Sequence, residues 1–183
     1  MFALGIDPGL TRCGYGAVRQ LSAGGRRSSD LRLEAVGHLT TPRELPVAQR
    51  LGILLEDLRQ LLADVRPDVV VVERVLFQTN ARTAMSVGQA SGLALATAAQ
   101  AGCPVVQYSP NEVKQAVAGH GAATKMQVQR MVQVLLQLDQ PPRPADRADA
   151  LALAICHLTG ARLRQAASNA EMTPHVAQVG TSR

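Results

Sequence analysis

Apolar residues fall into short runs and helix-spaced repeats that alternate along most of the chain. Short runs rich in branched side chains and bounded by Gly, Pro or polar clusters predict β-strands. Such runs lie at 2–6, 14–20, 31–40, 67–73 and 103–108. The fourth, PDVVVVE, shows no polar alternation, which predicts a central strand buried on both faces.

Leucines recur at helical spacing in 45–65, which predicts an amphipathic helix that ends at an Arg-Pro-Asp break. Further helices are predicted at 79–102, 111–118 and 124–138. A last helix follows the proline-rich segment QPPRP and is expected to end near residue 164. The polar segment SAGGRRSSD, between the second and third strands, has the composition of a hairpin loop.

This order of elements predicts an α/β fold in which helices cover a mixed five-stranded sheet. The length of 183 residues fits one domain with its own hydrophobic core. We place this domain at 1–165. The tail at 166–183 shows no periodicity, so we expect it to be disordered.

The formal net charge of +5 and the pI near 9.7 favour a polyanionic partner, although the excess is modest. Of the 19 cations only Lys114 and Lys125 are lysines; a GC-rich genome would also enrich arginine. The three cysteines are scattered, which indicates neither a disulfide framework nor a zinc site. No signal peptide and no membrane span are recognisable, so we expect a cytoplasmic protein without membrane association.

Four carboxylates stand at positions that can converge. Asp7 and Glu73 follow apolar strands, and Asp146 and Asp149 lie three residues apart at the start of the last helix, so they share one face. Converging carboxylates repel one another unless cations lie between them. Hard oxygen ligands select Mg²⁺ or Mn²⁺. Two such ions, about 4 Å apart, can activate a water molecule and stabilise the leaving oxygen of a phosphodiester.

Each acid also has a plainer interpretation. Asp146 and Asp149 could complement the dipole of a helix N-terminus, whereas Glu73 could end a solvated strand and Asp7 could form an Asx turn. The segment GIDPGLTRCGYG is also similar to the first phosphate loop of the actin, sugar-kinase and heat-shock ATPase group. That architecture needs a second phosphate loop and a second domain, for which this chain is too short.

Four ordered blocks carry a more specific signal: GIDPGLTRCGYG, VVVVERVLFQTNARTAMSVGQASG, EVKQAVAGHGAATKMQVQRMV and ADRADALALAICH. Together they resemble the RuvC family of crossover junction endodeoxyribonucleases, which have an RNase H-like fold. The resemblance implies that Asp7, Glu73, Asp146 and Asp149 are catalytic and hold two divalent ions, Mg²⁺ or Mn²⁺. Some members of the family have His in place of the third acid. Here that residue is Asp146, which implies all-oxygen coordination.

The same resemblance implies residues that contact DNA. The segment after Glu73 corresponds to a DNA-probing loop with an aromatic wedge, and here the wedge is either Leu76 or Phe77. The alternative is that Phe77 packs in the core. Lys114 and Lys125 match basic positions that flank the active site. Further candidates for phosphate contacts are Arg74, Arg82 and Arg130.

The resemblance implies a Holliday-junction resolvase that hydrolyses symmetrically related phosphodiesters in DNA recombination and repair and leaves 5′-phosphate nicks that a ligase can seal. The alternatives are an RNase H-like nuclease with another nucleic-acid substrate and a junction-binding protein that has lost catalysis. The implied partners are four-way junction DNA, a second copy of the chain and the RuvA–RuvB branch-migration complex. Ala84, Gly88, Gly92 and Ala96 recur at steps of four and are interpreted as part of the homodimer face; packing on their own sheet is the alternative.

Overall fold

A computed structural model describes residues 1–21, 31–75 and 81–171, with the backbone alone for 81–83 and 161–171. The strands are β1 (Phe2–Asp7), β2 (Arg12–Gln20), β3 (Leu31–Thr40), β4 (Val69–Glu73) and β5 (Val105–Tyr108). The helices are α1 (Val47–Val65), α2 (Ala81–Gln100), α3 (Pro110–Ala118), α4 (Lys125–Leu135) and α5 (Ala145–Glu171). These are the predicted elements, with ends that differ by no more than three residues except at the end of α5.

The strands form one mixed five-stranded sheet, as predicted, and their order in it is β3-β2-β1-β4-β5. β2 pairs antiparallel with both β1 and β3, whereas β1 and β5 both run parallel to β4, which lies between them. Because β1 and β4 are parallel, their carboxyl ends reach the same edge of the sheet, where Ile6 lies opposite Val72. Asp7 and Glu73 are the next residues of these two strands and therefore lie at this edge.

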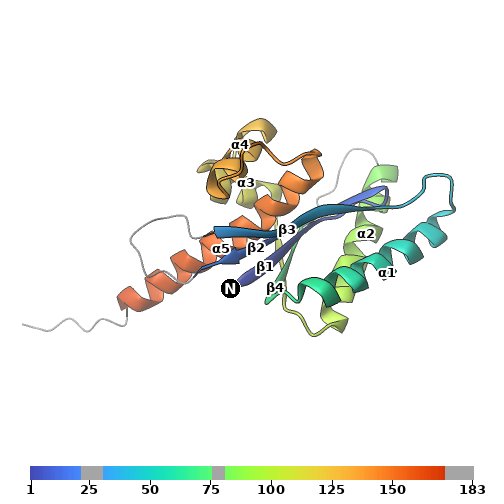
Figure 1. Cartoon of the computed structure of the whole chain (residues 1–183), viewed down its shortest axis with the longest axis horizontal. Coiled ribbons are helices and arrows are strands. Elements are labelled where there is room, and N and C mark those ends of the chain that lie inside the picture. Colours follow the sequence, from blue (N-terminus) through green and yellow to red (C-terminus); the bar gives the residue numbers. More distant parts are fainter. Residues whose placement is uncertain (22–30, 76–80, 172–183) are drawn as a thin grey trace, which may run out of the picture.

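Helices cover both faces of the sheet (Figure 1). On one face the leucines of α1, including Leu54 and Leu58, pack with small residues of α2 against Val70 and Val72. On the other face α5 lies along β1 and β2, with α3 and α4 packed on its outer side, and this core includes Val71. Alternate valines of β4 thus enter different cores, which confirms the strand that was predicted to be buried on both faces. None of the helices in the described ranges has the length and apolarity that crossing a bilayer requires.

The helices α3 and α4 begin at capping boxes, formed by Ser109 with Glu112 and by Thr124 with Gln127. The predicted end of α4 at residue 138 is wrong by three residues. Gln137 adopts a left-handed backbone conformation, with φ of 53°, and a residue in this conformation stops an α-helix. The capping box of α4 fixes the position of its first residue, which is Lys125.

The last helix is longer than predicted. α5 continues to Glu171 instead of ending near 164, so the predicted boundary between domain and tail, at 165 and 166, falls inside this helix. The physical reason is that ARLRQAASNAE contains neither Pro nor Gly and is rich in Ala, Leu, Arg and Gln, which have high helix propensity. The rest of the predicted tail, 172–183, lies outside the described residues.

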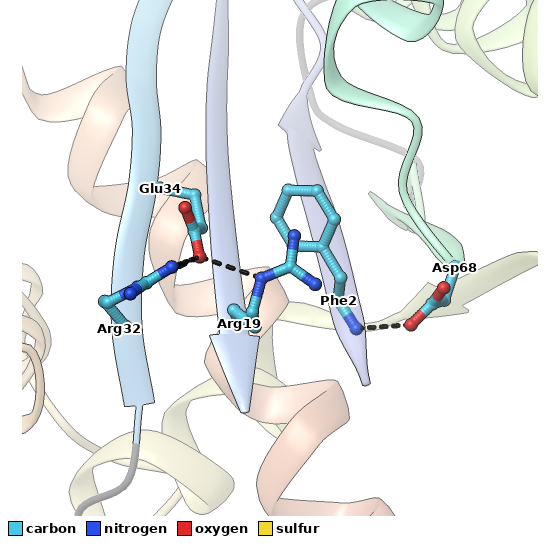
Figure 2. Close-up of polar contacts among 5 residues, drawn as sticks. All are labelled: Phe2, Arg19, Arg32, Glu34 and Asp68. Atoms are coloured by element: carbon cyan, nitrogen blue, oxygen red, sulfur yellow. Dashed lines mark hydrogen bonds and ion pairs between the residues drawn. The ribbon is translucent and has the colours of Figure 1, made fainter. Parts of the chain in front are cut away.

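A set of polar contacts holds the strands together at the end of the sheet opposite to Asp7 (Figure 2). The backbone N–H of Phe2 donates to Asp68, with 2.7 Å between N and Oδ2, and the guanidinium of Arg19 lies 4.0 Å from the centre of the Phe2 ring. Glu34 accepts hydrogen bonds from Arg19 and from Arg32, which lower the pKa of its carboxyl group. These contacts join β1, β2, β3 and the start of β4 at the end of the sheet that carries no candidate site residue.

Gly5 allows α5 to approach β1 closely, and this approach positions the carboxylates of α5. A Cβ atom at Gly5 would overlap the carbonyl oxygen of Ala150, in the first turns of that helix. We expect Gly5→Ala to destabilise the protein by about 1–3 kcal/mol, because the helix must move away from the sheet. Denaturant unfolding with Gly52→Ala as the control measures this effect. Gly52 lies in α1 with open space around it, so its substitution is expected to be neutral or stabilising. Equal stability of the two variants would contradict the assignment.

Candidate active site

The four predicted carboxylates lie in one cavity. Asp7 ends β1, Glu73 ends β4, and Asp146 and Asp149 lie in the first turns of α5. Carboxylate oxygens of Asp7, Asp146 and Asp149 all lie within 4.8 Å of one another. Glu73 lines the same cavity, which has a volume of about 400 Å³. The strands and the helix therefore bring together residues that are up to 142 positions apart in the chain.

Burial and mutual repulsion raise the pKa values of these acids. Burial is the largest cause of the raised pKa of Asp7, which reaches about 7, and the charges of Asp149, Glu73 and Asp146 add to it. Burial, followed by the charge of Asp149, also raises the pKa of Glu73. The pKa of Asp149 is raised as well, mainly by burial. Fully ionised acids are thus unfavourable here unless a cation neutralises them.

Lys125 provides one such cation. Its Nζ lies 2.6 Å from Oδ2 of Asp149. Burial alone would lower the pKa of Lys125, but the hydrogen bond to Asp149 and the charges of Asp149, Asp7 and Asp146 raise it. The sequence interpretation placed Lys125 beside the active site as a contact for DNA. The structure places its ammonium group directly on one of the four carboxylates.

The other predicted DNA-binding residues differ in their positions. Lys114 is half-buried and lines the carboxylate cavity. It forms no ion pair with any carboxylate of the described residues. Arg74 is exposed, and its guanidinium donates to the carbonyl oxygen of Gln107 at 3.3 Å. Arg130 is exposed on α4. The remaining predicted contacts, Leu76, Phe77 and the side chain of Arg82, lie outside the described residues.

The sequence interpretation did not include Arg12, whose Nη1 lies 3.4 Å from Oδ2 of Asp146. Its only sequence signal is a cation five residues after Asp7, at the first residue of β2. Cys13, the next residue, is buried, and burial is the main cause that raises the pKa of its thiol to about 12. Cys13 does not line the carboxylate cavity, and the group of potential metal ligands in the described part of the chain consists of Asp7, Asp146 and Asp149.

His157 is buried on α5, where its Nδ1 lies 3.1 Å from the hydroxyl group of Tyr108. It does not line the carboxylate cavity. This contact ties α5 to the end of β5 and indicates a structural role for His157.

An all-oxygen set of this kind fits a hard divalent cation. Asp7, Asp146 and Asp149 each offer an oxygen at a separation that one ion can span, and Glu73 borders the same space. The raised pKa values mean that a bound cation would relieve repulsion already present in the folded chain. The donor set therefore matches the predicted Mg²⁺ or Mn²⁺ chemistry rather than that of a soft metal.

Known proteins are similar to this chain in both sequence and fold. The family model described as crossover junction endodeoxyribonuclease RuvC matches residues 3–157. A protein of that name from Chloroflexus aggregans is 50% identical over 157 residues, which are 86% of this chain and 92% of the relative. The structure of Thermus thermophilus RuvC is 39% identical, with a TM-score of 0.80 over 90% of this chain and 97% of that chain. A second structure, of T. thermophilus RuvC in complex with Holliday junction substrate, has the same identity and TM-score over 90% of this chain and 96% of that chain.

Proposed function

This chain belongs to the RuvC family of crossover junction endodeoxyribonucleases, and on that basis we propose that it resolves Holliday junctions by metal-dependent hydrolysis at the carboxylate cavity. Its fold is the RNase H-like fold of this family. The observation that carries the proposal is the convergence of Asp7, Asp146 and Asp149 within 4.8 Å, with Glu73 beside them. The substrate would be four-way junction DNA, the substrate named for the T. thermophilus relative.

The four carboxylates would hold two divalent ions, Mg²⁺ or Mn²⁺. When bound, such ions supply an activated water molecule and charge stabilisation for the leaving 3′-oxygen of a phosphodiester. Asp7 would be the ligand shared by the two ions, because it interacts electrostatically with Glu73 as well as with Asp146 and Asp149. Cleavage at the 3′-oxygen would leave 5′-phosphate nicks that a ligase can seal.

Lys114 and Lys125 would act on the phosphate side of this cavity. Lys125 forms an ion pair with Asp149. With metal ions on the carboxylates, its ammonium group would be available to a phosphate oxygen. Lys114 reaches the same cavity from α3, so both cations lie where negative charge develops during cleavage.

We expect Lys114→Gln to lower the rate of junction cleavage about 10- to 100-fold, because it removes a cation that faces the reacting phosphate. Single-turnover cleavage with the enzyme in excess measures the rate without the step of junction binding. The matched control is Arg59→Gln on α1, whose cation pairs with Glu56 and lies outside the cavity. A cleavage rate that Lys114→Gln leaves unchanged would refute the role of Lys114.

Further DNA contacts are proposed from the resemblance. Leu76 or Phe77 would lie against bases near the crossover, because apolar side chains stabilise unstacked base steps. Arg74 and Arg82, next to these residues in the chain, would contact phosphates. The segment begins at the carboxylate edge of the sheet, because Arg74 directly follows Glu73 at the end of β4.

The proposed assembly is a homodimer that pairs through α2. Gly88, Gly92 and Ala96 are exposed, and a Cβ atom at either glycine would meet no other atom within 4 Å. The core-facing side of α2 is instead formed by Ala90, Ala94 and Ala98. The small-residue ridge is therefore free to allow close approach of a second helix. A two-fold axis also suits a four-way junction, in which two strands of like polarity are cut. The RuvA–RuvB complex is the proposed functional partner, by family resemblance.

Comparison of three substrates tests this function against its alternatives. We expect rapid cleavage of a mobile four-way junction in Mg²⁺ and little cleavage of a linear duplex or an RNA–DNA hybrid of the same sequence. Equal cleavage of all three would favour an RNase H-like nuclease with broader specificity. Tight junction binding without cleavage in either Mg²⁺ or Mn²⁺ would indicate an inactive junction-binding protein.

A further inference from the structure

A second cleft adjoins the carboxylate cavity, and three arginines are among its nine lining residues. It has a volume of about 320 Å³ and lies between the β1–β2 turn, the start of α1 and α2. Three guanidinium groups line it, those of Arg12, Arg43 and Arg50, whereas Asp146 is its only acidic lining residue among those that the structure describes. Asp146 also lines the carboxylate cavity, so the two spaces meet at this side chain.

The three arginines are held in different ways. Arg50 is half-buried and fixed, because its Nε donates to Thr41 at 3.0 Å and its Nη2 donates to Thr11 at 2.8 Å. Arg43 is exposed and has no hydrogen-bond or ion-pair partner among the described residues. Arg12 has a half-exposed side chain and pairs with Asp146. The cleft thus combines the fixed guanidinium of Arg50 with two more exposed cations, Arg12 and Arg43, which can turn towards an incoming anion.

We propose that this cleft binds a backbone phosphate of the DNA strand next to the cleaved bond, with Arg43 and Arg12 as its direct contacts and Arg50 as the residue that shapes the wall. The inference rests on the proposed function, because it takes DNA as the ligand of the adjoining cavity. Arginine suits this role because its planar guanidinium can donate two parallel hydrogen bonds to one phosphate group. The continuity of the two spaces through Asp146 places this phosphate beside the reacting one.

The pair of Arg12 and Asp146 also couples this cleft to the metal centre. Asp146 forms an ion pair with Arg12, with 3.4 Å between Oδ2 and Nη1. A divalent ion held by Asp146 would compete with Arg12 for the carboxylate, and the guanidinium would then be available to phosphate. The contribution of Arg12 to DNA affinity is therefore larger with a divalent ion than without one, whereas the contribution of Arg43 is the same in both conditions.

Junction binding at several salt concentrations tests both statements. Fluorescence anisotropy with a labelled four-way junction is measured for wild type, Arg12→Gln, Arg43→Gln and the control Arg59→Gln. Arg59 is a suitable control, because its side chain is 51% exposed against 50% for Arg12 and also takes part in an exposed ion pair. Each titration is done in EDTA and in Ca²⁺, with a denaturing gel to show that the strands stay intact. Inorganic phosphate is added in a separate arm to separate DNA from a free anion as the ligand.

In Ca²⁺ we expect Arg12→Gln and Arg43→Gln each to reduce the slope of log K against log salt by about 0.9 and to weaken binding about 5-fold at 0.15 M salt. Arg59→Gln should match wild type. In EDTA the loss should persist for Arg43→Gln and nearly vanish for Arg12→Gln.

Two outcomes would contradict the proposal. Slopes equal to that of Arg59→Gln would overturn the cleft assignment, and equal losses for Arg12→Gln in both conditions would overturn its coupling to Asp146. If inorganic phosphate competes at millimolar concentration and the junction slopes do not change, the cleft is a free-anion site and the proposal fails. Failure of the proposed function is distinct, because there wild type itself would not cleave the junction.

Discussion

Asp7→Asn should lower junction cleavage by a factor on the order of 10³ or more in saturating Mg²⁺. Asn keeps the shape of Asp but removes one negative charge from the cluster of acids. In this cluster a carboxylate oxygen of Asp7 lies within 4.8 Å of oxygens of both Asp146 and Asp149. Two-metal hydrolysis depends on a ligand of this kind to hold the ions at a fixed separation. Single-turnover cleavage of a labelled junction measures the loss.

Binding to the junction should survive in Asp7→Asn. In metal-free buffer we expect equal or tighter binding, because the substitution removes one charge that repels the phosphates. Asp139→Asn is the matched control, since Asp139 is exposed in the segment before α5 and does not line the cavity. If Asp7→Asn cleaves as fast as Asp139→Asn does, Asp7 is not a catalytic ligand. A circular dichroism spectrum equal to that of wild type would show that Asp7→Asn is folded.

The same residue should make the metal-free protein less stable as the pH rises from about 4 to about 7. The folded state holds a proton on Asp7 up to about pH 7, whereas the unfolded chain releases it near 3.8. Because the folded state binds more protons in this window, its free energy of unfolding falls as the pH increases. The difference in pKa corresponds to roughly 4 kcal/mol at most, and partial solvent access reduces this to about 2–4 kcal/mol. The raised pKa values of Glu73 and Asp149 act in the same direction.

Thermal unfolding measures this effect. At pH 8 in EDTA, Asp7→Asn should melt above wild type by an amount on the order of 10 °C, and the gap should close near pH 4, where Asp7 is protonated. Mg²⁺ at pH 8 should raise the melting temperature of wild type more than that of Asp7→Asn, because bound cations remove the repulsion. A wild-type melting temperature that does not depend on Mg²⁺, together with no gain in Asp7→Asn, would contradict the strained carboxylate cluster.

Much of the fold follows from local patterns in the sequence. The uninterrupted valines of β4 indicate a strand buried on both faces, and their alternation between two cores confirms it. The convergence of Asp7 with Glu73 follows from two apolar strands that each end in an acid. Parallel pairing of these strands then brings both acids to one edge. The spacing of Asp146 and Asp149 places both on one face of α5.

Contacts between distant segments could not be predicted in the same way. The pairing of Arg12 with Asp146 spans 134 residues and depends on how closely α5 lies on β1 and β2. That approach is possible because Gly5 and Gly14 leave room for the helix backbone. The contact of Lys125 with Asp149 likewise depends on where the capping box of α4 starts that helix. Periodicity describes one element at a time, so it contains no information on these pairs.

The most direct test of the central claim is the mapping of cleavage products from a mobile four-way junction during a Mg²⁺ titration. We predict no cleavage in EDTA, and with Mg²⁺ two nicks at symmetrically related positions in strands of like polarity, which a ligase can seal. Asp7→Asn should give almost no nicks at any Mg²⁺ concentration. Cleavage in EDTA, or nicks scattered equally over all four strands and over a linear duplex, would contradict a metal-dependent resolvase centre built on these four carboxylates.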